Sequence, residues 1–180
     1  MVLGLLLVAG LVPGPAWAAS PASAVSPVRA SVLAGVDSIR LEMMACLVRG
    51  DIAGAIALYE AETGQAAPAW LMELQGAYSV ANQQAGKCQQ VARIIHTAFG
   101  KLGQTPQYIA IRALGNKDYI AFDMASGKSP GITYNGYHAA VMIEDRVYDA
   151  YTGPMGMKLM DYMSRLHAEL GVTWTVVSAP

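Results

Sequence analysis

The sequence predicts an α+β fold, in which helices come first and a mostly antiparallel sheet follows. Two observations indicate this order. Apolar residues recur at intervals of three and four up to about residue 99, as on one face of a helix, and short β-branched or aromatic runs take over from about residue 108. The length of 180 residues and the hydrophobic content of 54% fit one globular domain with a sizeable core.

The first 18 residues have the features of a cleavable export signal. A run of Val, Leu, Gly and Ala ends at Ala16-Trp17-Ala18, which has the small-x-small form of a signal-peptidase site. The apolar run is too short to span the roughly 30 Å hydrocarbon core as a helix. We therefore expect a signal peptide over residues 1–18, a linker over residues 19–28 and a domain over residues 29–180. The protein would be secreted or periplasmic, with no stable membrane insertion after cleavage.

Helices are predicted for the first half of the domain. Their ranges are residues 29–49, 52–61, 69–83 and 88–99. Gly50 is a helix stop, and Asp51 is a predicted N-cap for the second helix. The fourth helix begins at Cys88, directly after a stretch that contains Gly86.

The second half is predicted to form the sheet and one more helix. The strands cover residues 108–112, 119–122, 138–143, 146–149 and 172–177, and the helix covers residues 157–170. A two-residue turn at Glu144-Asp145 would join the third and fourth strands. In that register His138 and Asp149 are diagonal neighbours on one face of the hairpin, within side-chain reach of each other.

A cysteine at a helix start, a histidine at a strand start and a carboxylate on the next strand suit thiol catalysis. A free thiol is only a few per cent ionised at neutral pH, and the N–H groups of a helix N-terminus favour its thiolate. A histidine next to the thiol favours the thiolate further, provided that a carboxylate or an amide holds its second ring nitrogen. The predicted catalytic residues are Cys88, His138 and Asp149.

The two cysteines leave an alternative open. Cys46 and Cys88 in an exported chain could form a disulfide, which an oxidising compartment favours. Cys46 also lies on the apolar side of the first predicted helix, where free cysteine acts as a small hydrophobe. Two free thiols fit an enzyme, whereas a bridge fits a non-catalytic exported binding or immunity-type module.

Other kinds of site find no support in the sequence. The formal net charge is −1 and the 12 basic residues are dispersed, so nucleic acid is not an expected partner. Neither metal-ligand spacings nor a phosphate-binding glycine loop occur, and we expect no metal and no organic cofactor.

The segment around His138 resembles a known family. Asn135-Gly136-Tyr137-His138, then Val147-Tyr148-Asp149, then Pro154, Gly156 and Tyr162 resemble the papain-fold toxin domains of bacterial polymorphic toxin systems, which belong to the papain-like cysteine peptidase superfamily. Cys88 sits where that family places its nucleophile. The resemblance covers about residues 80–166.

This resemblance implies a papain-like fold with Cys88 as the nucleophile, His138 as base and acid, and Asp149 as the residue that orients the histidine. It also implies an amide side chain in the oxyanion hole, ahead of the cysteine. Asn82 or Gln83 would fill that place, with the backbone N–H of Cys88 as the second donor. An Asp149→Asn change should then be milder than Asp149→Ala, since the amide oxygen still accepts a hydrogen bond from the imidazole.

The expected function is that of a secreted or periplasmic papain-like cysteine hydrolase. It would act on amide bonds of a protein or peptide, as a peptidase or a deamidase, and serve as an antibacterial toxin or effector with an immunity protein as partner. Within the same chemistry, the alternatives are a transglutaminase-like acyl transferase and a cell-wall amidase of papain fold. The bridged binding or immunity-type module is the alternative from another class.

Overall fold

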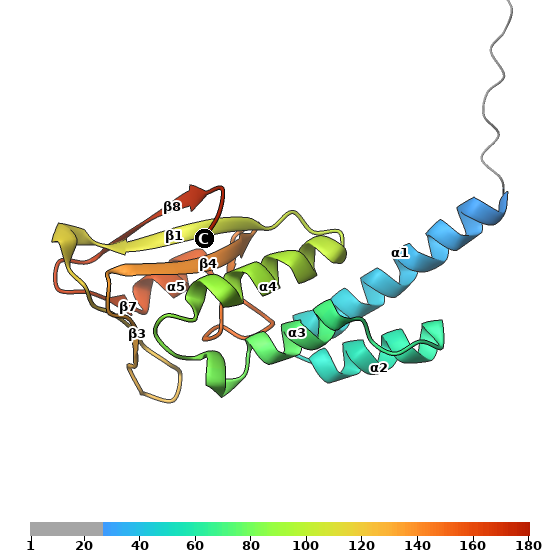
Figure 1. Cartoon of the computed structure of the whole chain (residues 1–180), viewed down its shortest axis with the longest axis horizontal. Coiled ribbons are helices and arrows are strands. Elements are labelled where there is room, and N and C mark those ends of the chain that lie inside the picture. Colours follow the sequence, from blue (N-terminus) through green and yellow to red (C-terminus); the bar gives the residue numbers. More distant parts are fainter. Residues whose placement is uncertain (1–26) are drawn as a thin grey trace, which may run out of the picture.

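The computed structural model describes the backbone of residues 27–180 and the side chains from residue 35 onward. The predicted signal peptide and most of the predicted linker lie outside the described residues. Figure 1 shows a helical half, formed by the first three helices, and a sheet half, with the fourth helix lying along the sheet. Within residues 27–180, none of the helices is both long and apolar enough to cross a membrane.

The four predicted helices of the first half are present. They are α1 (Pro27–Val48), α2 (Ile52–Thr63), α3 (Ala69–Ala77) and α4 (Cys88–Lys101). The first begins two residues earlier than predicted, at Pro27, because the fixed φ of proline suits the first turn of a helix. The predicted N-cap is confirmed, since Oδ1 of Asp51 accepts a hydrogen bond of 2.7 Å from the Gly54 N–H.

Helix α3 is six residues shorter than predicted. It ends at Ala77, and the chain continues into a short 3₁₀ turn, η1 (Val80–Asn82). The side chain of Asn82 donates a hydrogen bond of 2.8 Å to the Gly76 carbonyl, one of the last carbonyls of α3. This bond satisfies a group that a helix end leaves unpaired, and thereby stabilises the early stop.

Two sheets make up the second half. The larger sheet contains β1 (Gln107–Ala113), β4 (Tyr137–Ile143), β5 (Arg146–Tyr148), β6 (Met157–Lys158) and β8 (Val172–Val177), in the order β6-β5-β4-β1-β8 with all neighbouring pairs antiparallel. The smaller sheet contains β2 (Ile120–Phe122), β3 (Gly131–Thr133) and β7 (Leu166–His167), in the order β3-β2-β7. The α+β class is confirmed, and its arrangement is consistent with a papain-like fold.

The predicted helix over residues 157–170 is wrong for most of its length. Only α5 (Leu159–Ser164) is helical. Before it, β6 pairs with β5, and after it β7 pairs with β2. Tertiary strand pairing therefore overrides the helical spacing of this segment. Strand β3 was not predicted either, because its three residues follow a Gly- and Ser-rich loop.

The larger sheet has a hydrophobic core on each face. Side chains of β4 alternate between them: Ala139, Val141 and Ile143 pack in the core that includes Ile95 and Phe99 of α4, whereas Ala140 packs in the second core. The second core contains Ile109, Ile111, Phe122, Tyr162 and Leu166. Strand β4 is thus fixed from both sides, and it is the strand that carries His138.

The β4–β5 hairpin has the predicted register. Ile143 lies opposite Arg146 and Val141 opposite Tyr148, which is the pairing of a two-residue turn at Glu144-Asp145. Glu144 adopts a φ of 54°, in the left-handed region that such tight hairpin turns require and that non-glycine residues seldom occupy. The register that brings His138 and Asp149 together is confirmed.

Candidate active site

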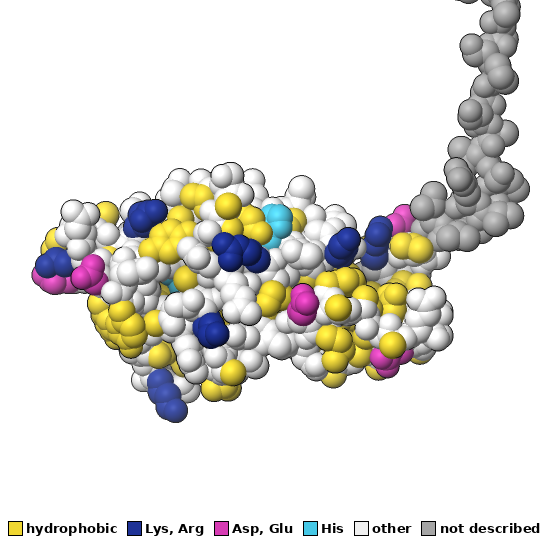
Figure 2. Space-filling view, viewed as in Figure 1, with side chains coloured by type: hydrophobic (Ala, Val, Ile, Leu, Met, Phe, Trp, Pro, Cys, Tyr) yellow, Lys and Arg dark blue, Asp and Glu magenta, His cyan; other side chains and the backbone are white. Residues whose placement is uncertain are grey.

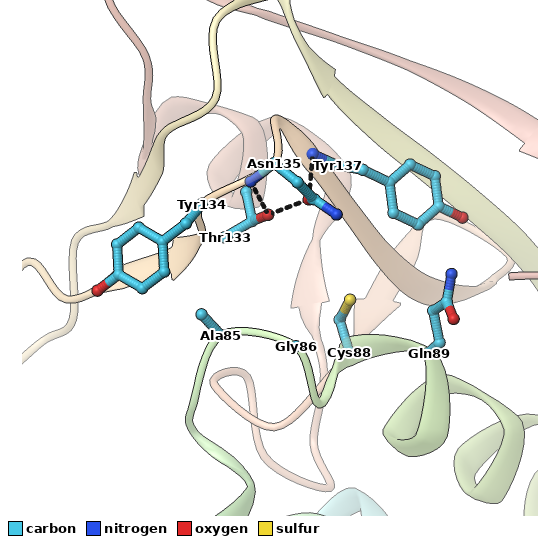
Figure 3. Close-up of a pocket in the computed structure, with 8 residues that line it drawn as sticks. All are labelled: Ala85, Gly86, Cys88, Gln89, Thr133, Tyr134, Asn135 and Tyr137. Carbon is cyan, nitrogen blue, oxygen red and sulfur yellow. Dashed lines mark hydrogen bonds between the residues drawn. The ribbon is translucent and has the colours of Figure 1, made fainter.

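Cys88 is the first residue of α4. The preceding Gly86 turns the chain with a φ of 85°, and Lys87, at the N-cap position, makes no side-chain capping bond. The first turn of α4 also contains no acidic residue. The N–H groups of this helix start are therefore free to stabilise a negative charge on the Cys88 sulfur. Figure 3 shows the sulfur pointing from the helix toward the chain of residues 133–137.

A tight turn positions the beginning of β4. Oδ1 of Asn135 accepts hydrogen bonds from the Thr133 hydroxyl (2.6 Å) and from the Tyr137 N–H (3.1 Å), as Figure 3 shows. Gly136 follows with a φ of 67°, and a Cβ at this position would lie 2.1 Å from the Lys117 carbonyl oxygen. Only glycine fits here, so the Asn-Gly pair determines where His138 enters the sheet.

Strand β5, one of the two partners of β4, ends before it reaches His138. Because β5 stops at Tyr148, the first residues of β4 have no β5 neighbour on that side. A small cavity lies there instead, and it brings together residues of several chain segments: Asn82, Gln84, Cys88, Val91, His138, Asp149, Ala150 and Tyr151. The three predicted catalytic residues all line this one cavity.

His138 and Asp149 form a buried pair. Nε2 of the imidazole lies 3.0 Å from Oδ2 of the carboxylate, and both side chains are 2% exposed. The other ring nitrogen, Nδ1, is buried and neither accepts nor donates a hydrogen bond among the described residues. Nδ1 is therefore the nitrogen left for the Cys88 thiol.

Asp149 is held by more than the histidine. Its Oδ1 accepts hydrogen bonds from the N–H groups of Tyr151 (2.8 Å) and Thr152 (2.9 Å), and its Oδ2 also accepts one of 2.6 Å from the Tyr162 hydroxyl. Burial raises the pKa of the Asp149 carboxyl. Hydrogen bonds from His138, Tyr162 and the Tyr151 N–H lower this pKa by more than burial raises it, so the net shift is downward. Asp149 is thus an oriented anion at neutral pH.

The electrostatics favour an ion pair between the thiolate and the imidazolium. Burial lowers the pKa of His138, but Asp149 and Cys88 raise it more, to about 9. For the Cys88 thiol the effect of burial has the opposite sign and raises the pKa. His138 and the N–H groups of Ala139 and Gln89 outweigh it and bring the thiol pKa below its ordinary value. A proton on His138 and a negative charge on Cys88 therefore stabilise each other.

Both cysteines are free thiols in this structure. Cys46 lies on α1 and Cys88 at the start of α4, and no disulfide joins them. Among the described residues, no group of three or more His, Cys, Asp or Glu is arranged to hold a metal ion.

An open groove runs from Cys88 along the outside of the molecule. It has a volume of about 380 Å³ and is lined by Ala85, Gly86, Cys88, Gln89, Thr133, Tyr134, Asn135 and Tyr137; we call it the thiol groove. Figure 3 shows Ala85 and Tyr134 on one side of the cysteine, and Gln89 and Tyr137 on the other. The sulfur is therefore accessible to a substrate that lies across the groove.

One comparison with known proteins decides the family. The sequence model described as papain fold toxin 2 matches residues 74–167, which contain Cys88, His138 and Asp149. The chain belongs to this papain-fold toxin family. No curated protein and no solved structure matches the chain significantly.

The amides proposed for the oxyanion hole of the papain-fold toxin lie near the site, but both are engaged elsewhere. Asn82 lines the small cavity and donates to the Gly76 carbonyl, while the Gln83 amide donates a bond of 2.9 Å to the Ala150 carbonyl. The next residue, Gln84, lines the same cavity as Cys88, and its side chain makes no hydrogen bond among the described residues. It is the freest of the three amides.

Two aromatic residues of the toxin's site were given no role from the sequence. The Tyr162 hydroxyl donates a hydrogen bond to Asp149; the sequence names Tyr162 only as one of the residues that resemble the family, without a role in the site. Tyr151 packs edge-on to His138 with ring centroids 6.5 Å apart. The spacing of 13 residues between Asp149 and Tyr162 corresponds to no regular element, so no pattern in the sequence indicated the contact.

Tyr162→Phe should reduce the activity of the papain-fold toxin by about tenfold, because a hydrogen bond to a charged group contributes about 1.5–3 kcal/mol. With the hydroxyl gone, more negative charge faces His138, and its pKa should rise above about 9. The measurement is the pH profile of the reaction at Cys88, whose upper limb should move to higher pH.

The control for this change is Tyr59→Phe on α2, where the phenol donates no hydrogen bond to any described residue. Thermal unfolding of both variants separates loss of folding from loss of orientation. A reduced rate with an unmoved pH profile would mean that Tyr162 only fills space in the core.

Proposed function

We propose that this papain-fold toxin is a cysteine hydrolase that cleaves amide bonds through Cys88, His138 and Asp149. The observation that carries the proposal is the buried contact of 3.0 Å between Nε2 of His138 and Oδ2 of Asp149. Because Nε2 contacts the carboxylate, Nδ1 is the ring nitrogen that is available to the Cys88 thiol at the start of α4. A nucleophile, a base and a group that orients the base are the three parts that thiol catalysis needs.

The chemistry would proceed in two steps. The Cys88 thiolate attacks the amide carbonyl carbon, and the imidazolium of His138 gives its proton to the leaving nitrogen as the carbon–nitrogen bond breaks. The resulting thioester is then attacked by water, which gives a proton to the neutral His138. The carbon–sulfur bond breaks, the acyl group leaves as a carboxylic acid, and the Cys88 thiolate and the His138 imidazolium are restored. The backbone N–H of Cys88 and one nearby amide, for which we favour Gln84, would stabilise the oxyanion.

The open thiol groove favours a large substrate. The sulfur lies at an open surface, between Ala85 and Tyr134 on one side and Gln89 and Tyr137 on the other, so a segment of a larger chain can lie across it. Peptide cleavage and side-chain deamidation share the same steps and differ only in which amide lies against the sulfur. We further propose that the protein is exported and acts as an antibacterial toxin, which the family and the Ala16-Trp17-Ala18 site support.

The proposal predicts a defined dependence on pH. Activity needs the thiolate and the protonated imidazole together. It should fall at low pH as the Cys88 thiolate takes up a proton, below the ordinary thiol pKa, and it should fall again at high pH as His138 loses its proton near pH 9.

The decisive experiment is alkylation by iodoacetamide near pH 6 (about three pH units below the pKa of about 9 for His138), with the labelled residue mapped by mass spectrometry. Cys88 should react much faster than Cys46, because His138 and the N–H groups at the start of α4 lower the pKa of the Cys88 thiol and so favour its reactive thiolate. His138→Ala should remove that difference and leave the fold intact.

Cys46 serves as the internal control, as a half-buried free thiol on α1. If Cys88 reacts no faster than Cys46 in the parent protein, the thiolate is not stabilised and the hydrolase proposal fails. The non-catalytic binding module would then be the better account.

A further inference from the structure

Two arginines stand at one end of the thiol groove. The guanidinium carbon of Arg112, on β1, lies 4.9 Å from the ring centroid of Tyr137, which lines the groove. Arg93 lies one helical turn after Gln89 on α4, and Gln89 also lines the groove. Burial and the Cys88 charge raise the pKa of the Tyr137 phenol, and the charges of Arg112 and Arg93 oppose this rise without cancelling it.

Among the described side chains, neither arginine is neutralised by a carboxylate. The ion pairs there are Arg40–Asp37, Lys117–Glu169, His138–Asp149 and His167–Asp123. Both arginine residues are exposed. Asp118 and Lys117 line a shallow pocket beside Arg112, but Asp118 forms no ion pair with it. The charges at this end of the groove are thus available to a ligand.

The rest of the cleft adds no accessible negative charge from the described residues. The thiol groove is lined by no Asp or Glu, and the carboxylate in the adjoining small cavity is the buried Asp149. A second groove beyond Tyr151, with a volume of about 650 Å³, contains Lys128 and again no carboxylate. On the face that Figure 2 shows, basic side chains lie over the sheet and α4 and also at the left tip and over the helical half, whereas acidic side chains lie only at the left tip and over the helical half.

We infer that the groove selects substrates that carry acidic side chains next to the amide that reacts, on the side of Cys88 where Tyr137 lies. This rests on the proposed function and gives its substrate a chemical class, an acidic segment of a protein. A guanidinium stacked on a ring keeps its N–H edge free, and that edge binds carboxylates through two parallel hydrogen bonds. Arg112 has this arrangement, with its guanidinium over the Tyr137 ring.

The test uses two pools of peptidyl vinyl sulfones, which alkylate catalytic cysteines. The pools are identical random peptides except that one fixes a pair of glutamates beside the electrophile and the other fixes a pair of lysines. The rate of Cys88 modification should be about tenfold higher with the glutamate pool, because exposed pairs between arginine and glutamate are weakly attractive; this factor corresponds to about 1.4 kcal/mol.

The preference should depend on the two arginines and on salt. The double variant Arg93→Gln with Arg112→Gln should lose most of it, whereas Arg49→Gln, an exposed arginine on the helical half, should keep it. Raising NaCl from about 0.01 M to about 1 M should also reduce the preference, because the screening length falls from about 30 Å to about 3 Å.

Iodoacetamide separates this inference from the proposed function, because it carries no charge. Fast labelling of Cys88 by iodoacetamide together with equal rates for the two pools, or faster labelling by the lysine pool, would overturn the acidic-substrate inference alone. A glutamate preference that survives in the double variant would overturn it as well. Slow labelling of Cys88 by iodoacetamide would instead overturn the hydrolase proposal on which the inference rests.

Discussion

Cys88→Ala is expected to abolish amide hydrolysis and toxicity on expression while leaving the fold unchanged. Removal of a catalytic nucleophile in a comparable enzyme costs a factor of about 10⁶ in rate, and alanine offers no group to form the thioester. The fold should survive because Cys88 is half-buried, forms no disulfide and lies at a helix start, where it packs only at the edge of the core.

Cys46→Ala is the matched control. Cys46 is also a half-buried free thiol, but it lies on α1 and contacts Arg49 through a bond of 3.5 Å. We expect full activity and similar thermal unfolding for this variant. If the two variants lose activity equally, or if Cys88→Ala unfolds the chain, the thiol at position 88 has a structural role and the enzyme hypothesis must be abandoned.

Asp149→Asn is expected to be nearly as damaging as loss of the whole carboxylate, with a fall in rate of about 10⁴, as for the same change in serine enzymes. The sequence alone suggested a milder effect, and the geometry revises this expectation. The single amide oxygen has to face the N–H groups of Tyr151 and Thr152, since an amide NH₂ there would oppose two donors.

The NH₂ group of the introduced amide would then face Nε2 of His138. It would donate to that nitrogen, so the ring proton would have to sit on Nδ1, the nitrogen nearest the thiol, and the imidazole could no longer accept a proton there. The carboxylate of Asp149 raises the pKa of His138 to about 9. Without this carboxylate, the fall in activity near pH 9 should disappear from the pH profile.

The control for this change is Asp145→Asn, in the exposed turn of the same hairpin. It should keep the parent rate and the parent pH profile. Activity of Asp149→Asn within a few-fold of the parent would show that the amide orients the histidine adequately, and that the two backbone N–H groups do not fix which way the amide faces. Thermal unfolding of each variant checks that the comparison is between folded proteins.

The sequence was most informative where local rules decide the structure. The Asn135-Gly136 turn, the alternation of β4 and the helix start at Cys88 each depend on a few adjacent residues, and the pairing of His138 with Asp149 followed from a two-residue turn. The family resemblance over residues 80–166 agrees with the match over residues 74–167. These features place Cys88 and His138 without any knowledge of distant contacts.

The features that were missed depend on contacts between distant segments. Residues 157–170 have a helical spacing, but β6 and β7 form because β5 and β2 offer unpaired edges to them. Tyr162 reaches Asp149 only because the short α5 packs against the sheet. The choice of amide for the proposed oxyanion hole depends on where α3 ends, because the candidate amides follow that end. The end of α3 is in turn stabilised by the hydrogen bond from Asn82 to the Gly76 carbonyl. None of these follows from spacing along the chain.

The part of the chain that the family shares is shorter than the part that packs together. Residues before 74 supply Met43, Leu47, Ile52 and Leu71 to the core that supports α4, and residues after 167 supply β8, which pairs along the whole length of β1 except its first residue. The segment that matches the family and the unit that packs together therefore have different boundaries in this protein. Residues 74–167 alone would leave one side of α4 and the β1 edge of the larger sheet uncovered.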